Sequence, residues 1–378
     1  MVSPLYLTLL VGPLEPLPAP KPLSDALVSV EVTESATGRS GFQLTFTLAD
    51  KGILETFFLL AGGAPLPIIR VVLLATFPGI PQVLIDGVVM HTEVQPDAMS
   101  GSSKLVVTGQ DLTAMMDLID FSGLPYPGMS PDLRALTILA KYAVFGVVPE
   151  VVPVPAPDIP IPVQTTPSQK QTDFQYLDAM AKEVGYVFYL VPGPLPGMSQ
   201  AYWGPQMRLG IPQTALNVNM DTWTNVESLN FRYEQQNTVL PVVFIQDPIT
   251  KVPIPIPIPP VTPFSPPLGA AILPPQKVEF LSDTAKLNPA VALMRGFARV
   301  TETSDTVTGD GTLDVLRYGQ PLRARSLVGV RGAGIAFDGM HYVDKATHRI
   351  KPGEYKESFV LKRNALVSST PVVPSLPF

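Results

Sequence analysis

The sequence contains no cysteine among its 378 residues, which excludes disulfides, thiolate metal sites and cysteine nucleophiles. Charge is also scarce, because Asp, Glu, Lys and Arg together make up 15% of the chain, against about a quarter in an average globular protein. So few charged side chains favour a permanent assembly over a free monomer. The formal net charge of −6 provides no overall basic surface, so we expect no nucleic acid partner.

The chain also lacks a segment that predicts a membrane span or a secretory signal. Its apolar amino terminus is interrupted by prolines and carries no basic residue before Lys21, unlike a signal peptide. The uncharged stretch 57–69 is too short to cross a bilayer. The longest uncharged run, 252–276, contains ten prolines, and an open extended segment in lipid would leave backbone groups unsatisfied. We therefore expect no direct membrane span.

Catalytic motifs are missing as well. The chain has no GxSxG, HExxH, EF-hand, dinucleotide-binding or P-loop pattern. Of its three histidines, His91, His341 and His348, the last two are seven residues apart. On one regular strand, residues at that spacing point to opposite faces and would not share a metal. The sequence thus predicts no catalytic residue, no cofactor and no metal, and a protein that is not an enzyme.

Proline is abundant in two tracts, 148–167 and 241–275, the second containing KVPIPIPIPPVTPFSPP. Alternating Ile-Pro favours polyproline II, because each ring fixes φ and pushes the preceding residue to extended geometry. We interpret both tracts as stiff surface loops or spacers. The alternative is an arm that docks on a neighbouring subunit, which the isoleucines favour over a polar linker.

Between these features the pattern is largely β. Apolar residues alternate in 26–33 and 42–48, as in half-buried strands. Asp86-Gly87 lies between two apolar runs and predicts a hairpin turn. A strand from 104 to 108 then leads through Gly109 and Asp111 into a short helix. We predict a first β-barrel over 23–111, preceded by an amino-terminal tail, 1–22.

The middle of the chain is mixed. The segment 131–145 has helical apolar spacing and begins with proline and aspartate. A second helix is predicted over 172–185, followed by the strand YVFYLV. These elements indicate an α/β domain over 112–215.

The last third is β again, with an expected strand at 225–233, a hairpin turn at Asp338-Gly339, a turn at 352–353 and a final strand from Lys356. The interval from Asp338 to Lys356 equals that from Asp86 to Lys104, 18 residues, and each contains a turn, the first at 99–101. This is weak evidence for a duplicated barrel. We predict a second barrel from 216–240 plus 296–366, a proline-rich insertion over 241–295 and a carboxy-terminal tail, 367–378.

The order of these elements resembles the phage late control protein D family and the amino-terminal part of VgrG spikes. The resemblance rests on FQLTFTLAD, VVTGQDL, TDFQYLDAMAKEVGY and NVESLNFRYEQQN, and on the closing stretch from GQPLRARSL to VLKRN. In that closing stretch the matching positions are Tyr342, Val343, His348, and the turn that contains Gly353 and Tyr355. Most of residues 25–366 is covered.

The resemblance implies a β-rich α+β chain with two tube-type β-barrels, which acts as the baseplate hub of a contractile injection system. As a homotrimer, such a hub presents six barrel units to a sixfold inner tube protein and adapts them to a threefold spike. The chain ends soon after its last strand, so we expect a separate spike protein, together with baseplate wedge proteins as partners. We expect assembly in the cytoplasm as part of a phage-tail-like particle. Alternatives are another tube-end, wedge or adaptor protein of the same machine, and a secreted β-rich glycan-binding or hydrolytic module.

Overall fold

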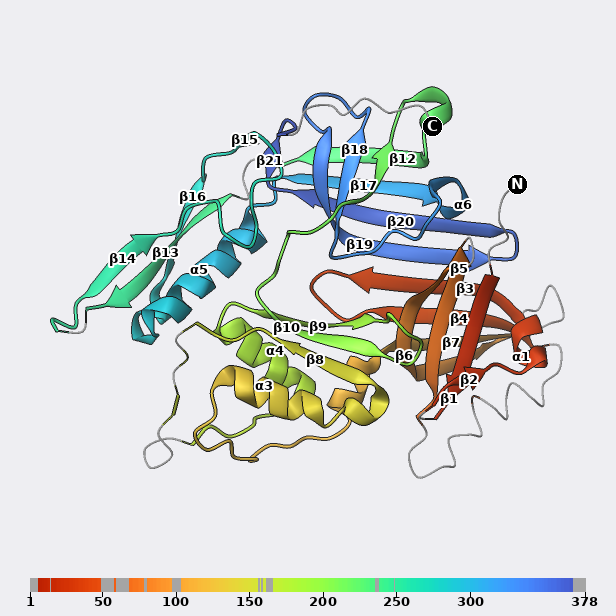
Figure 1. Ribbon diagram of the computed structural model, residues 1–378, viewed down its shortest axis with the longest axis horizontal. Coiled ribbons are helices and arrows are strands. Elements are labelled where there is room, and N and C mark those ends of the chain that lie inside the picture. Colours follow the sequence, from red (N-terminus) through yellow and green to blue (C-terminus); the bar gives the residue numbers. More distant parts are fainter. Residues whose placement is uncertain are drawn as a thin grey trace.

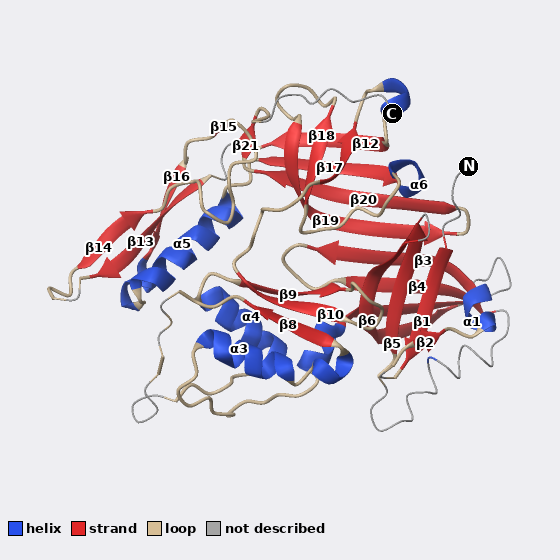
Figure 2. Ribbon diagram, in the orientation of Figure 1, coloured by secondary structure: helices blue, strands red, loops and turns tan. Residues whose placement is uncertain are grey.

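The computed structural model describes residues 6–13, 15–48, 58, 68–77, 80–96, 103–155, 157, 159–160, 166–234, 238–247 and 249–369. Figure 1 shows a long β-sheet, a helix-containing unit beside one half of it, and an arm that extends away from the other half. The longer helices lie in the helix-containing unit and the arm, as Figure 2 shows. The β-rich α+β class predicted from the sequence is confirmed.

Thirteen strands form one sheet, in the order β12-β17-β20-β19-β3-β4-β7-β6-β5-β1-β2, with β18 also pairing β19 and β11 pairing β18. The amino-terminal β module comprises β1 (Tyr6–Gly12), β2 (Leu17–Pro18), α1 (Lys21–Asp25), β3 (Leu27–Ser35), β4 (Gly41–Leu48), β5 (Arg70–Phe77), β6 (Ile80–Gln95) and β7 (Ser103–Asp111). The carboxy-terminal β module comprises β11 (Gln213–Asn217), η5 (Asp221–Trp223), β12 (Val226–Tyr233), β17 (Val307–Asp314), α6 (Val315–Tyr318), β18 (Leu327–Arg331), β19 (Gly339–Lys351) and β20 (Glu354–Arg363).

The two β modules meet where β3 pairs antiparallel with β19, from Lys345↔Ser35 to Ile350↔Val30. One hydrophobic cluster contains buried side chains of both modules, among them Phe46 on β4 and Phe359 on β20. The two β regions expected from the sequence are therefore halves of one continuous sheet, and their closure as separate tube-type barrels stays a prediction.

Alternating apolar residues explain most of these strands. In β4, Phe42, Leu44, Phe46 and Leu48 face the core, and the intervening residues do not. The strands predicted at 26–33 and 42–48 and the last strand from Lys356 are confirmed, as is the turn at 352–353, which joins paired residues Lys351 and Glu354.

The hairpin turn predicted at Asp86-Gly87 is wrong. Strand β6 continues without interruption from Ile80 to Gln95, and the chain reverses between Phe77 and Ile80 instead. Asp86 pairs with Val72 in the ladder with β5, and its carboxylate accepts from Arg70 on the same strand. Gly87 is needed for close packing: a Cβ there would lie 2.2 Å from the carbonyl oxygen of Gln110.

Asp338-Gly339 also differs from the expected two-residue turn. Strands β18 and β19 do form an antiparallel pair, but the connection between them spans 332–338, and Gly339 is the first residue of β19. The turn predicted at 99–101 lies outside the described residues. Residues 6–12, expected in an amino-terminal tail, form β1 and pair along their whole length with β5. In the carboxy-terminal tail, 370–378 lie outside the described residues.

The helix-containing unit has a three-stranded sheet, β8-β10-β9, with β8 and β10 parallel. Helices α3 and α4 contact this sheet (Figure 1). Its elements are η3 (Leu112–Asp117), α3 (Pro131–Ala140), η4 (Ala143–Phe145), β8 (Val147–Val151), α4 (Asp173–Glu183), β9 (Val187–Pro192) and β10 (Ser199–Gly204). Both helices predicted here are confirmed, and the Thr172 side chain caps α4. The short helix after Asp111 is present as 3-10 helix.

The arm corrects the interpretation of the second proline tract as polyproline II. Its elements are β13 (Val239–Gln246), β14 (Pro253–Pro257), β16 (Lys277–Leu281), η6 (Ser282–Lys286) and α5 (Pro289–Thr303), while β15 (Ala271–Ile272) pairs with β21 (Ala365–Leu366) near its base. The segment PIPIP is an edge strand that pairs with β13. The alternation of proline with isoleucine permits this pairing, because Ile254 and Ile256 direct their N–H groups to the same edge of the strand.

The first proline tract, 148–167, is described only in part, because residues 156, 158 and 161–165 lie outside the described residues. Its start belongs to β8, which spans 147–151.

Candidate functional site

A group of five polar side chains, four of them buried and Arg323 partly buried, lies where the two β modules meet. We call it the seam cluster. It consists of Glu34 on β3, Arg323 before β18, His348 on β19, and Tyr355 and Glu357 on β20. His348 Nδ1 is 2.7 Å from Glu357 Oε1 and 3.0 Å from the Tyr355 hydroxyl. On its other side, His348 Nε2 is 3.6 Å from Glu34 Oε1. The imidazole thus stands between two carboxylates from different modules.

Further hydrogen bonds hold each carboxylate of the seam cluster. Glu34 accepts from the Arg323 guanidinium and from the Ala324 N–H at 3.2 Å. Glu357 Oε2 accepts from the Leu322 N–H at 3.0 Å. Arg323 also donates to the carbonyl of Val83 on β6, so the segment before β18 bridges both modules.

These contacts shift pKa values in opposite directions. Burial alone would lower the pKa of His348, but the carboxylates of Glu357 and Glu34 raise it to about 9. Burial alone would raise the pKa of Glu34, but the charges of Arg323 and His348 lower it to about 2. At neutral pH His348 is therefore an imidazolium and Glu34 a carboxylate.

A comparison with His341 shows how strongly the surroundings of a buried histidine set its pKa. His341 is as buried as His348, yet burial and the nearby charge of Arg363 lower its pKa to about 3. Both rings lie on the same side of β19, because the pairing with β20 shifts by one residue between Val343 and Lys345. The expectation that His341 and His348 point to opposite faces of the strand is wrong, since the bulge shifts the alternation of side chains by one residue.

A second buried ion pair joins the amino-terminal β module to the helix-containing unit. Arg70 Nε and Nη2 donate to Asp86 Oδ1 and Oδ2 at 2.8 and 2.7 Å. Arg70 Nη2 also donates to the carbonyls of Phe145 and Gly197 at 2.8 and 2.9 Å. Burial raises the pKa of Asp86, and Arg70 opposes that rise. One guanidinium therefore ties β5 and β6 to two loops of the neighbouring unit.

The remaining positions singled out in the first β region are structural. Asp111 accepts the N–H of Thr113 at 3.1 Å, which caps η3, and that of Ser40 at 2.7 Å. Its burial raises its pKa. Gly109 allows β4 and β6 to approach β7, because a Cβ there would lie 2.3 Å from both the Phe42 ring and a backbone oxygen.

The positions in the second β region are likewise structural. Asp338 accepts the N–H of Ala333 at 2.8 Å and holds the loop before β19. Tyr342 and Val343 are buried. Gly353 adopts a φ of 80° in the β19–β20 turn, a conformation that favours glycine. Only His348 and Tyr355 among the predicted positions come together in one site.

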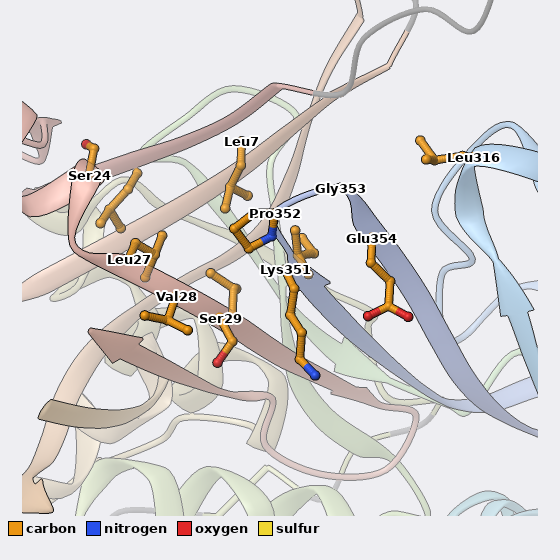
Figure 3. A pocket seen from close by; sticks show the side chains of 13 residues that line it. Leu7, Ser24, Leu27, Val28, Ser29, Leu316, Lys351, Pro352, Gly353 and Glu354 are labelled. Atoms are coloured by element: carbon orange, nitrogen blue, oxygen red, sulfur yellow. The ribbon is translucent and has the colours of Figure 1, made fainter. Parts of the chain in front are cut away.

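An open cavity of about 420 Å³ lies between β1, β3 and the β19–β20 turn. Figure 3 shows its side chains coming from these elements and from α6. It is lined by Leu7, Leu9, Ser24, Leu27, Val28, Ser29, Val30, Leu316, Ile350, Lys351, Pro352, Gly353 and Glu354. Glu354 is the one carboxylate among these lining residues, so the cavity offers no pair of acids.

Within the described residues, no group of three or more His, Asp or Glu side chains could hold a metal ion. Among the helices formed by those same residues, none is long and apolar enough to cross a membrane.

Glu34, Glu357 and Arg70 were not singled out from the sequence, and no buried ion pair was predicted for Arg323. A usable signal existed for the two glutamates. Glu34 follows Val30 and Val32 in the inward phase of β3, and Glu357 lies two residues after buried Tyr355 on β20. A charged residue at an inward position predicts a buried ion pair. Arg323 and Arg70 lie at an irregular segment and at a strand start, where alternation carries no such signal.

Comparisons with known proteins concern the fold. No protein-family model and no curated protein matches the chain. Among solved structures, it is similar to a tail protein from Neisseria meningitidis MC58, with a TM-score of 0.62, 16% identity, and coverage of 95% of this chain and 97% of that one. It is also similar to the prophage MuSo2 43 kDa tail protein from Shewanella oneidensis, with a TM-score of 0.57, 12% identity and coverage of 95% and 98%. A third similar structure is a chain of the Francisella PdpA–VgrG complex, with a TM-score of 0.60, 12% identity and coverage of 99% and 60%.

The likeness to the two tail proteins extends over nearly the whole of both chains. It therefore includes both β modules, the helix-containing unit and their connections. The chain has the fold of these tail proteins and of part of a chain of the PdpA–VgrG complex, which confirms the resemblance seen in the sequence.

Proposed function

We propose that this protein is the baseplate hub of a contractile, phage-tail-like injection system and that it has no enzymatic activity. The observation that carries the proposal is the fold likeness over 95% of the chain to two tail proteins, one of them from a prophage. It is supported by the likeness to part of a chain of the PdpA–VgrG complex. We further propose that it assembles in the cytoplasm as part of a phage-tail-like particle.

The arrangement of the β modules supports a symmetry adaptor. Each chain contributes two β modules joined through β3 and β19. Three chains would place six such modules around one axis, which suits a sixfold tube on one side and a threefold spike on the other. In this proposal each module is a tube-type barrel, and the partners are an inner tube protein, a separate spike protein and wedge proteins.

Native mass in solution tests the proposal first. A trimer of the 40.7 kDa chain has a mass of about 122 kDa. We expect that mass for the purified chain alone or with its candidate spike protein, measured by light scattering at several concentrations. A persistent monomer in the presence of the spike would contradict the hub and leave an adaptor elsewhere in the tail as the better proposal.

A further inference from the structure

The β3–β19 ladder that joins the two modules consists of six residue pairs. The seam cluster lies on the inward side of this ladder, with Glu34 from one module and His348 from the other. The ring of Phe77 on β5 packs 5.6 Å from that of Tyr355. The orientation of the modules therefore depends on a short ladder, on the hydrophobic core that both modules share and on the charges packed against that ladder.

The protonated form of His348 suits its surroundings best, because both ring nitrogens face carboxylates: Nδ1 within hydrogen-bond distance, and Nε2, which has no hydrogen-bond partner, within ion-pair distance. Nδ1 faces Glu357 and the Tyr355 hydroxyl, and Nε2 faces Glu34. A neutral imidazole has one N–H and one lone pair. Either neutral tautomer would thus direct a lone pair at a carboxylate, whereas the imidazolium presents an N–H to each.

The charge balance leads to the same result. Glu34 on β3 and Glu357 on β20 face His348, and Arg323 pairs with Glu34 from the segment before β18. Arg325 of that segment also lowers the pKa of Glu34 and donates to the carbonyls of Ala36 and Gly38, both at 3.4 Å. Loss of the His348 proton would leave Glu357 buried without a cationic partner, and an uncompensated buried charge is costly.

We propose that the seam cluster is a pH-sensitive joint: while His348 carries its proton the two β modules are held in one orientation, and loss of that proton at alkaline pH lets them move relative to one another. The sign follows from the pKa of His348, raised from 6.5 to about 9. The stabilisation is complete below pH 6.5 and is lost as the pH rises through about 9. This property concerns the single chain and goes beyond the proposed hub function.

The absence of cysteine makes a direct test practicable. Spin labels at Gln43→Cys on β4 and Asn230→Cys on β12 report the distance between the modules, since both positions are exposed. We expect one narrow distance distribution from about pH 6 to pH 8 and a broad one by about pH 10, with a midpoint near 9, while far-UV circular dichroism is unchanged. A distribution that stays narrow to pH 10, or one that broadens only as circular dichroism is lost, would overturn the proposal.

Two variants of the labelled chain complete the test. His348→Gln is expected to give a broad distribution at every pH, and His91→Gln, which removes an exposed histidine, is expected to behave as the parent chain. A narrow distribution in His348→Gln across the range, or loss of the transition in His91→Gln, would contradict the joint. If His348→Gln does not fold, the pH titration of the parent chain still decides.

Discussion

Replacing Arg70 by methionine is expected to lower the free energy of unfolding by about 3–5 kcal/mol, because it leaves the Asp86 carboxylate buried without its counter-charge. The pair is bidentate, and the two side chains are only 4% and 0% exposed. The same change also leaves the carbonyls of Phe145 and Gly197 without this donor. Urea unfolding followed by circular dichroism measures the loss.

The matched control is Arg349→Met, which breaks the pair with Glu31. That pair has an N···O distance of 3.1 Å, but its side chains are 56% and 44% exposed, so the expected cost is below about 1 kcal/mol. A double variant, Arg70→Met with Asp86→Leu, is expected to recover much of the loss, because no unpaired charge remains. Equal costs for the two single variants, or a double variant as unstable as the sum of its parts, would refute this reasoning.

Three further predictions use the same urea measurement. Gly109→Ala is expected to lower the free energy of unfolding by about 1–3 kcal/mol, because the added Cβ would lie 2.3 Å from a backbone oxygen. Gly329→Ala is expected to be nearly neutral, because the atom nearest to its Cβ would be 3.6 Å away. Similar values for the two variants would contradict the close packing at Gly109. Trp203→Ala is expected to lower the free energy of unfolding by about 3–5 kcal/mol, because the ring is fully buried and its Nε1 donates to a carbonyl at 3.1 Å. The control Trp223→Ala is expected to cost less than about 0.5 kcal/mol, because Trp223 is 51% exposed. The pKa of Glu34 is about 2 in the folded chain, against an ordinary 4.5, so its contribution to stability is complete above pH 4.5 and is lost as the pH falls toward 2. Glu34→Gln is expected to flatten the pH dependence of the free energy of unfolding in that range. An unchanged pH dependence would exclude this contribution of Glu34.

Helices and strands whose apolar residues recur at a regular spacing were predictable from the sequence. The spacing of Leu177, Met180 and Ala181 on α4, with a threonine cap, is sufficient for a helix. Alternation in β3 and β4 likewise predicts strands. In these segments local propensity and burial agree, so their type does not depend on distant residues.

In other segments the secondary structure depends on residues that are distant in the chain. Asp86-Gly87 has the composition of a turn, but it pairs with β5 in the middle of a strand, where Asp86 accepts from Arg70, 16 positions away in the chain. The segment PIPIP has the composition of polyproline II, but β13 offers it a strand edge. In both cases tertiary pairing outweighs local preference.

The sequence by itself determined the β-rich class, the main helices and strands and the absence of thiol chemistry, because these follow from composition and from periods of two and 3.6 residues. Only the tertiary structure decided that the β modules form one sheet, and that Glu34, Arg323 and His348 meet at their seam. Glu34 is 289 positions from Arg323 and 314 positions from His348 in the chain. No local pattern encodes such contacts, since register and bulges are set by the packing of the complete core.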